Sequence, residues 1–210
     1  MSQPELQMSP ELLTFSAITS STEDVTIDGD TYTNIRDAVS TVIFEPVISS
    51  GIMRIEFSNI KDLSKVGLIE KSVHYRIGES LDNEENKKRS VRYLKSGEIS
   101  HWGDKIGGNT PFDKPGERIA LEVNMDSDPK TLTFYINDEE QPYYVTDLPL
   151  SVRFMANIKK KDDAFRVNKF EQLLTPTRKG VKGSRSYKWG KVWQSYNEKD
   201  AETKKKCAIQ

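Results

Sequence analysis

The sequence predicts an all-β fold, an antiparallel β-sandwich that is followed by a basic, mostly unstructured C-terminal tail. Three observations support this prediction: apolar and polar residues alternate over many short stretches, polar turn sequences separate these stretches, and the alternation stops near residue 174. The chain has 210 residues, of which 35% are hydrophobic and 30% charged. It is therefore long enough for one core plus a tail, and too short for two ordinary domains.

The clearest alternation runs over residues 118–125, RIALEVNM, where every second residue from Ile119 to Met125 is apolar. Residues 131–137 and 152–158 repeat the pattern. Shorter stretches of the same kind lie at residues 41–44, 52–57, 66–69, 90–94 and 164–167. Turn sequences separate them at residues 49–51, 95–98, 107–109, 113–116 and 137–140. Many short strands joined by polar turns favour an antiparallel sandwich over a parallel α/β sheet.

The same patterns predict how the chain is organised. We expect an N-terminal leader over residues 1–13, a sandwich over residues 14–174, a basic linker and tail over residues 175–206, and a terminal motif over residues 207–210. Within the body only one short helix is expected, near residues 169–174 or within residues 10–13. The charged run over residues 82–89, DNEENKKR, is expected to be a solvated loop.

Residues 116–158 resemble the C-terminal half of an SPRY domain. That half has a Gly-Asp pair before a strand, an Asp-Met-like pair at the end of the strand, a Phe-Tyr-X-Asn-Gly strand, and a Leu-Pro before the next strand. The residues in these places are Gly116-Glu117, Met125-Asp126, Phe134 to Asn137 and Leu148-Pro149. Upstream, residues 49–60 resemble the family's Ser-Gly strand and residues 90–103 its hairpin, so the resemblance covers roughly residues 40–172. Glu117 and Asp138 depart from the family's Asp and Gly, which indicates a divergent member.

The resemblance implies binding without catalysis, because SPRY domains present a protein- or peptide-binding surface formed by loops at one end of the sandwich. Three side chains stand where such loops are expected: His101, Trp102 and Tyr143. Trp102 is a candidate ligand anchor, since Trp is enriched at binding hot spots. The favoured alternative places Trp102 in the core and leaves His101 solvated. Tyr143 suits a contact surface, and Tyr144 or Val145 beside it is expected to be buried.

Charge divides the chain into an acidic body and a basic tail. Residues 1–177 carry a net charge of −8 and residues 178–206 one of +7. Cys207, the only cysteine, begins the sequence Cys-Ala-Ile-Gln, a C-a-a-X motif that predicts farnesylation by a prenyltransferase. Three lysines stand directly before it: Lys204, Lys205 and Lys206. They are the second signal that a single lipid requires at an anionic membrane, so we expect an anchor on a cytoplasmic membrane face.

Aromatic residues recur within the tail at helical spacing. Trp189, Trp193 and Tyr196 stand at positions i, i+4 and i+7 and predict an amphipathic helix over residues 187–197. A basic helix with two Trp side chains on its apolar face would lie among lipid headgroups or bind a partner of the calmodulin type. The alternative is that these aromatic side chains pack back onto the sandwich.

Other function classes find little support in the sequence. We see no phosphate-binding loop, nucleophile elbow or metal-ligand cluster, so no catalytic residue, cofactor or metal site is predicted. The acidic body is poorly suited to nucleic acid. The first residues lack the basic start and apolar run of a signal peptide, which favours an intracellular protein. Two alternatives stay open: a soluble or glycan- or lipid-recognising sandwich without lipidation, and an enzyme on an unusual scaffold.

Overall fold

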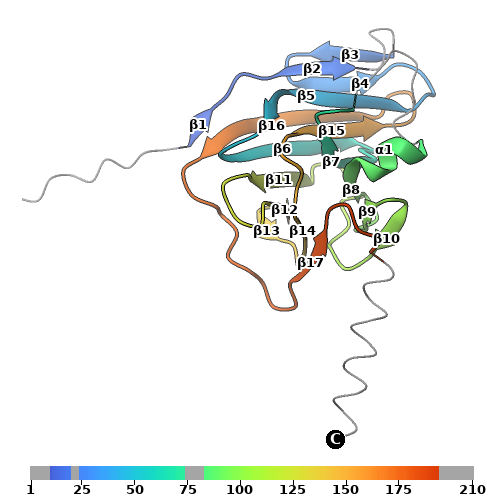
Figure 1. Cartoon of the computed structure of the whole chain (residues 1–210). Coiled ribbons are helices and arrows are strands. Elements are labelled where there is room, and N and C mark those ends of the chain that lie inside the picture. The colour runs from blue at the N-terminus through green and yellow to red at the C-terminus, as the bar shows by residue number, and fades with distance from the viewer. Residues whose placement is uncertain (1–9, 20–23, 74–82, 194–210) are drawn as a thin grey trace, which may run out of the picture.

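Two β-sheets packed face to face form the body of the protein (Figure 1). The computed structural model describes residues 10–19, 24–73 and 83–193. Across the first sheet, the strands are β17 (Arg185–Lys188), β14 (Tyr143–Thr146), β12 (Thr131–Ile136), β11 (Arg118–Asn124), β6 (Ile52–Lys61), β16 (Ala164–Leu173), β4 (Thr31–Asn34) and β3 (Val25–Asp28), with β1 (Glu11–Leu12) beside β16 and β13 (Glu139–Glu140) beside β12. Across the second sheet, they are β10 (Asp104–Ile106), β9 (Ile99–His101), β8 (Ser90–Leu94), β7 (Lys65–Glu70), β15 (Val152–Ile158), β5 (Ser40–Ile48) and β2 (Ser16–Thr19).

The strands follow the predicted alternation, so the all-β antiparallel sandwich is confirmed. All the described strand pairs are antiparallel except β14 and β17, which run parallel. Each of the predicted strands has a counterpart at the same place in the chain. On β11, for example, Ile119, Leu121 and Val123 are fully buried, as the alternation predicts.

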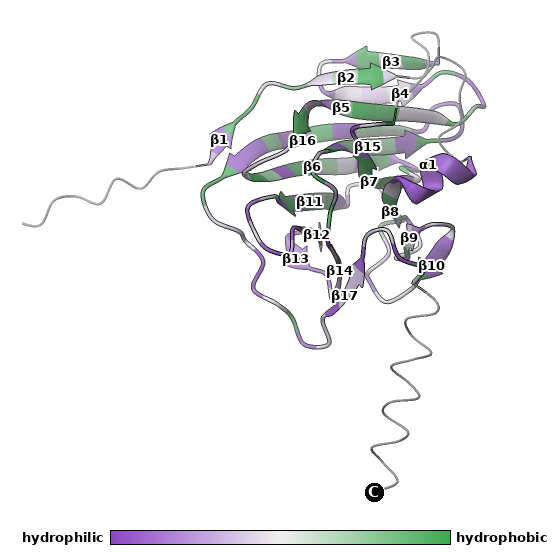
Figure 2. Ribbon diagram, viewed as in Figure 1, coloured by the Kyte–Doolittle hydropathy of each residue, from purple (hydrophilic) through white to green (hydrophobic). Residues whose placement is uncertain are grey.

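Aromatic side chains fill part of the space between the two sheets. Phe57 and Phe165 of the first sheet meet Phe44 of the second, with ring centroids 5.6 to 6.3 Å apart. Tyr32 stacks on Phe165 at 4.9 Å, and none of these four side chains is more than 3% exposed. Aromatic side chains bury large areas, so this cluster contributes strongly to holding the layers together. The green strand segments in Figure 2 mark the apolar sequence from which the core is built.

The helix of the described chain lies where the sequence predicts a loop. It is α1 (Glu84–Lys88), within the charged run, and Figure 2 shows that it is hydrophilic throughout. The side chain of Asn83 caps it by accepting a hydrogen bond from the backbone N–H of Asn86 at 2.8 Å. Acidic residues occupy its first turn and basic residues its last, which suits the helix dipole. The helix is therefore stabilised by its cap and by the order of its charges, rather than by the packing of an apolar face.

The one short helix predicted either near residues 169–174 or within residues 10–13 is wrong at both places. Residues 169–173 belong to β16, and a bulge between Val167 and Lys169 interrupts its alternation. The bulge places Val167 and Phe170 three residues apart on the same buried face, which imitates helical spacing. Residues 11–12 form β1, so part of the predicted leader already belongs to the first sheet.

The sandwich also extends beyond its predicted end at residue 174. From β16 the chain runs across the first sheet and returns beside β14, where β17 joins the sheet edge (Figure 1). Residues 175–193 are therefore part of the folded body rather than of an unstructured tail. The described chain has no helix with the length and apolar character needed to span a membrane.

Candidate functional site

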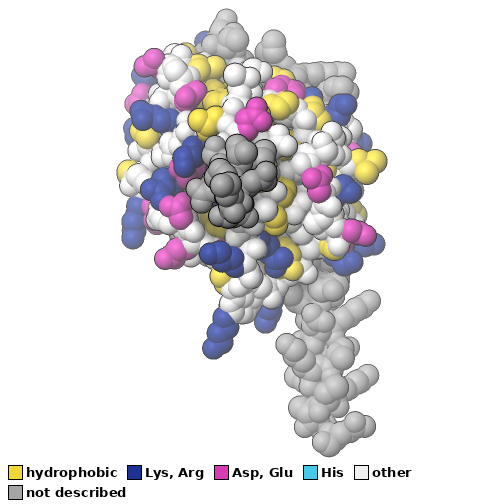
Figure 3. Space-filling view, turned by 90° about the vertical axis from the view of Figure 1, so that its left-hand side faces the viewer, with side chains coloured by type: hydrophobic (Ala, Val, Ile, Leu, Met, Phe, Trp, Pro, Cys, Tyr) yellow, Lys and Arg dark blue, Asp and Glu magenta, His cyan; other side chains and the backbone are white. Residues whose placement is uncertain are grey.

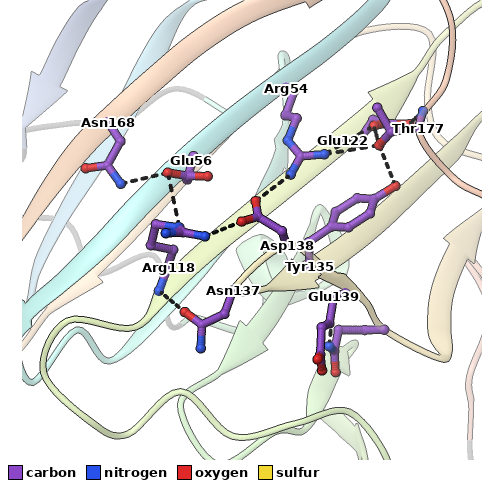
Figure 4. A network of polar contacts seen from close by, with 11 residues as sticks. Arg54, Glu56, Arg118, Glu122, Tyr135, Asn137, Asp138, Glu139, Asn168 and Thr177 are labelled. Carbon is purple, nitrogen blue, oxygen red and sulfur yellow. Dashed lines mark hydrogen bonds and ion pairs between the residues drawn. The ribbon is translucent and has the colours of Figure 1, made fainter.

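Residues 175–193, which we call the C-terminal strap, are held first by a carboxylate on the outer face of the first sheet. Glu122 of β11 accepts a hydrogen bond from the backbone N–H of Thr177 at 2.9 Å and another from the Thr177 hydroxyl (Figure 4). The Arg54 guanidinium lies 3.7 Å from Glu122 and 4.4 Å from the centroid of the Tyr135 ring. Glu122 is only 2% exposed, and a buried carboxylate requires such partners. The strap and Arg54 supply them.

A second carboxylate holds the next turn of the strap. Glu140 of β13 accepts hydrogen bonds from the backbone N–H groups of Lys179 at 2.7 Å and Gly180 at 3.0 Å. Arg178 lies in the sequence between Thr177, which Glu122 binds, and Lys179, which Glu140 binds. Its guanidinium stacks over the Tyr144 ring at 3.7 Å. Glu122 and Glu140 thus hold the backbone of the strap. The sequence gives no sign of these contacts, because they involve polar groups and not an apolar pattern.

The strap then becomes a strand and ends in an aromatic cluster. In β17, Tyr187 pairs with Val145 of β14, and its ring lies 5.4 Å from that of Tyr143. Trp193 is 1% exposed, and its indole N–H donates to the backbone oxygen of Lys188 at 2.9 Å. The backbone N–H of Trp193 donates to Asp104 at 2.8 Å.

The predicted helix over residues 187–197 is therefore wrong for its described part, which ends at residue 193. Trp189 and Trp193 pack back onto the sandwich, as the alternative interpretation proposed. Their spacing imitates a helix, but the strap makes its contacts with distant parts of the chain, Thr146 of β14 and Asp104 of β10. A membrane-facing or calmodulin-like use of Trp193 in this conformation is excluded, because its side chain is buried.

His101 connects the strap to the second sheet. Its Nε2 accepts a hydrogen bond from the backbone N–H of Gly190 at 2.8 Å, so the proton sits on Nδ1, which donates to the Ser90 backbone oxygen at 2.8 Å. The imidazole lies 5.1 Å from the Trp189 ring and 5.3 Å from the Trp193 ring. Burial lowers the pKa of His101 to about 4, against opposing effects from the Ser90 hydrogen bond and from Asp104. The side chain is thus a neutral structural link between two elements.

The expectation for His101 and Trp102 is reversed by the structure. His101 is 1% exposed, whereas Trp102 is 36% exposed at the tip of the β9–β10 hairpin. Trp102 and Gly103 form the two-residue loop, with φ of 56° and 88°, so both adopt left-handed backbone conformations. Trp102 is also fixed by α1: its backbone N–H donates to Lys87 O at 3.2 Å and its indole N–H to Lys88 O at 3.1 Å. A partly exposed Trp is thus presented in one orientation.

Tyr143, the third candidate, is half-buried between Tyr187 of the strap and the loop at residues 108–109. The Asn109 side chain pairs with its backbone, donating to Tyr143 O at 3.0 Å and accepting from Tyr143 N–H at 2.8 Å. The ring fits against Gly108, where a Cβ atom would lie 2.3 Å from a ring carbon. Val145 is fully buried, as predicted for one of the two residues that follow.

The departure from the SPRY pattern at Asp138 has a structural counterpart. Asn137 and Asp138 form the β12–β13 turn with φ of 49° and 71°, a conformation that favours Gly at the second position. Here the Asp138 carboxylate forms ion pairs with Arg118 and, at 3.9 Å, with Arg54 (Figure 4). The side chain therefore links β6 and β11 while the backbone accepts a less favourable conformation.

Five of the predicted site residues lie outside the described residues: Cys207, Lys204, Lys205, Lys206 and Tyr196. Sequence reasoning missed Glu122, Glu140 and Arg54, since charged residues that alternate with apolar ones are expected to face solvent. Within the described ranges, no three His, Cys, Asp or Glu side chains are grouped as metal ligands.

The comparisons with known proteins identify the fold. No family model and no curated protein matches the sequence. Among solved structures, the SPRY domain of human HERC1 is similar with a TM-score of 0.54 and 13% identity, over 74% of this chain and 99% of that chain. The TRIM65 PSpry domain is similar with a TM-score of 0.56 and 12% identity, over 75% of this chain and 89% of that chain. The body of this protein is therefore an SPRY-like β-sandwich, and at this identity the likeness concerns the fold.

Proposed function

We propose that this protein is a non-catalytic interaction module, an adaptor that binds a protein ligand at the sandwich end carrying the β9–β10 hairpin. The observation that carries the proposal is the placement of Trp102, which is partly exposed yet held by hydrogen bonds to two carbonyl groups of α1. The likeness to SPRY domains supports it, because such domains serve protein interaction.

Trp102 has the properties of an interface anchor. Large aromatic side chains contribute strongly to binding when they insert into a partner pocket, and a side chain that is already ordered loses little entropy on binding. The Lys88 ammonium group, 5.7 Å from the Trp102 ring centroid, adds a positive charge beside the aromatic surface. An acidic or polar rim around an apolar pocket on the partner would complement this pair.

The second part of the proposal is a lipid tether. Cys207 in the sequence Cys-Ala-Ile-Gln, together with Lys204, Lys205 and Lys206, supports farnesylation and attachment to an anionic cytoplasmic membrane face. The described part of the strap ends at Trp193, whose backbone N–H donates a hydrogen bond to Asp104 on β10 of the hairpin. Residues 194–207 span at most about 50 Å, so a lipid on Cys207 would keep the Trp102 end within that distance of the membrane.

The binding proposal is tested by quantitative affinity capture from cells with the wild-type chain, Trp102→Ala and a control. Leu12→Ala is a suitable control, since Leu12 is an apolar residue on β1 that is 71% exposed and far from the hairpin (Figure 1). We expect a set of partners that Trp102→Ala loses and Leu12→Ala retains. If both variants recover the same partners as the wild type, the hairpin is not the binding end.

The tether is tested by the intact mass of the protein expressed in a eukaryotic host, beside Cys207→Ser. We expect loss of Ala208 to Gln210 with gain of a farnesyl and a methyl group, and release of Cys207→Ser from the membrane fraction. Replacing the three lysines by Gln should weaken membrane binding and reduce its salt dependence. An unmodified C-terminus would leave the alternative, a soluble binding protein without lipidation.

A further inference from the structure

The outer face of the second sheet contains a groove that adjoins the proposed hairpin site, since Gly103 of the hairpin loop lines it whereas Trp102 does not. It has a volume of about 520 Å³ and follows β8 and β9, with further residues from β7, α1 and the neighbouring loops. Its described lining includes six basic side chains: Lys65, Lys87, Arg92, Lys95, Lys105 and Lys159. The acidic side chain among the described lining residues is Glu98.

Strand register brings these cations together. Arg92 of β8 pairs with Ser100 of β9, and Ser100 pairs with Lys105 of β10, so the three residues form one row across the sheet. On β7, Lys65 pairs with Leu94 of β8. The strand neighbours of Arg92 and Ser100, such as Val91, Tyr93 and Ile99, are buried in the core. Because side chains alternate along a strand, the row of Arg92, Ser100 and Lys105 faces outward. The sheet therefore fixes the backbone positions from which the basic side chains extend.

The charge of the groove stands out against the rest of the molecule. Lys95 and Lys87 form ion pairs with Asp62 and Glu84, both at 2.5 Å. The described lining itself contains six bases and one acid, Glu98, although residues 1–177 are acidic overall. On another face, basic and acidic side chains are interspersed (Figure 3). A cleft lined mainly by one sign of charge concentrates the field and attracts the opposite charge.

The depth of the groove narrows the class of ligand. Lys65 and Arg92 are only 6% and 7% exposed, so they form its floor and a ligand must enter to meet them. The headgroups of a flat bilayer would not reach these two side chains, whereas an extended peptide is narrow enough to enter the groove. Single-stranded nucleic acid binds by stacking its bases on aromatic side chains, and the described lining contains none.

We propose that this groove binds an acidic segment of a protein partner, rich in phosphoserine or glutamate. Arg and Lys side chains form charge-assisted hydrogen bonds with phosphate and carboxylate oxygens. Two serine hydroxyls in the lining, those of Ser64 and Ser100, add neutral donors, whereas that of Ser96 donates to Glu98 at 2.8 Å. The inference rests on the proposed function in that it assumes a protein ligand, but the basic side chains it uses lie in a groove that Trp102 does not line.

The test is fluorescence anisotropy with the full chain and a labelled peptide of the sequence Glu-Glu-pSer-Glu-Glu. We expect saturable binding that weakens as salt rises. The variant Lys105→Glu with Lys159→Glu should bind at least about tenfold more weakly, since both side chains are exposed and line the groove. Its melting temperature should match that of the wild type, which separates loss of binding from loss of folding.

The matched control is Lys169→Glu with Lys182→Glu, which changes the net charge equally at exposed positions of β16 and of the strap. We expect this control to bind the peptide within about twofold of the wild type. Equal losses in both variants, or no loss in either, would overturn the site. So would a wild-type chain that ignores the peptide but binds phosphatidylserine vesicles or oligo(dT) through Lys105 and Lys159.

The same assay distinguishes this inference from the proposed function. Trp102→Ala should retain peptide binding, because Trp102 is not among the residues that line the groove. Failure of the peptide to bind, while Trp102→Ala still loses its cellular partners, would refute the groove alone. Binding of the peptide without any partner that depends on Trp102 would refute the hairpin site alone.

Discussion

The outer faces of the two sheets carry charged residues in contrasting ways. On the first sheet, the groove beside the strap holds about 400 Å³, and its described lining balances Arg54 and Lys179 against Asp138 and Glu140. On the second sheet, the larger groove is lined mainly by bases. The chain itself supplies partners for the first face, through the backbone and side chains of the strap. This difference indicates that charge on the first face holds the strap on the fold, whereas the basic groove of the second face is the surface that we propose for a ligand.

The largest effect should come from removing the aromatic end of the strap. We expect Trp193→Ala to lower the free energy of unfolding by about 3–5 kcal/mol, the usual cost of deleting a fully buried Trp side chain. Chemical denaturation measures it, and Trp102→Ala is the control, with a loss below about 1 kcal/mol because Trp102 is partly exposed. Equal unfolding midpoints for wild type and Trp193→Ala would show that the strap is not part of the cooperative fold.

The link through His101 should make stability depend on pH. Its pKa is lowered to about 4 in the folded protein against about 6.5 when unfolded, so folding favours the neutral imidazole. Stability should be complete above about pH 6.5 and fall by an amount on the order of 3 kcal/mol as pH drops toward 4. The measurement compares unfolding free energies of wild type and His101→Gln across this range. A constant difference between the two would exclude His101 as the cause.

A somewhat smaller loss should follow when the strap loses its buried carboxylate. We expect Glu122→Gln to cost about 2 kcal/mol, because an amide weakens the bonds from Thr177 and removes the charge facing Arg54. Limited proteolysis should then cleave the strap faster than in the wild type. Glu70→Gln is the control, since Glu70 lies on β7 of the second sheet, away from the strap. Identical behaviour of the two variants would contradict a clamp at Glu122.

The smallest effect is expected at the β12–β13 turn. Asp138→Gly removes ion pairs with Arg54 and Arg118 but relieves a left-handed backbone conformation, so the two effects oppose each other. The net change should stay within about 1 kcal/mol of zero by thermal or chemical unfolding. Asp138→Ala loses the ion pairs without the backbone relief and should be less stable than Asp138→Gly. The reverse order would mean that the turn carries little strain.

Much of the fold, and little of the candidate site, was predictable from the sequence. The strands with clear alternation were predictable, because alternation of apolar residues is a local pattern that one strand displays by itself, whereas β2, β3 and β4 were not predicted. The places of His101 and Trp102 were not, because which neighbour is buried depends on the direction of the hairpin and on α1 packing beside it. The basic groove was equally hidden, because Lys65, Arg92 and Lys105 are brought together only by strand pairing.

The strap shows where local patterns fail. Trp189 and Trp193 stand four residues apart, which is helical spacing, yet the chain there follows the edge of β14 and then turns. The decisive partners are Thr146, His101 and Asp104, all more than forty residues away in sequence. Since isolated short helices are marginal in water, such tertiary contacts outweigh the local preference.

The sequence by itself determined the fold class and the strands with clear alternation, such as β6, β11, β12 and β15, because alternation is a property of neighbouring residues. Only the tertiary structure decided that the segment after residue 174 joins the body, that His101 is buried while Trp102 is exposed, and that six cations share one groove. The physical reason is that burial and charge clustering depend on which distant strands pair. That pairing is settled by the packing of the whole chain.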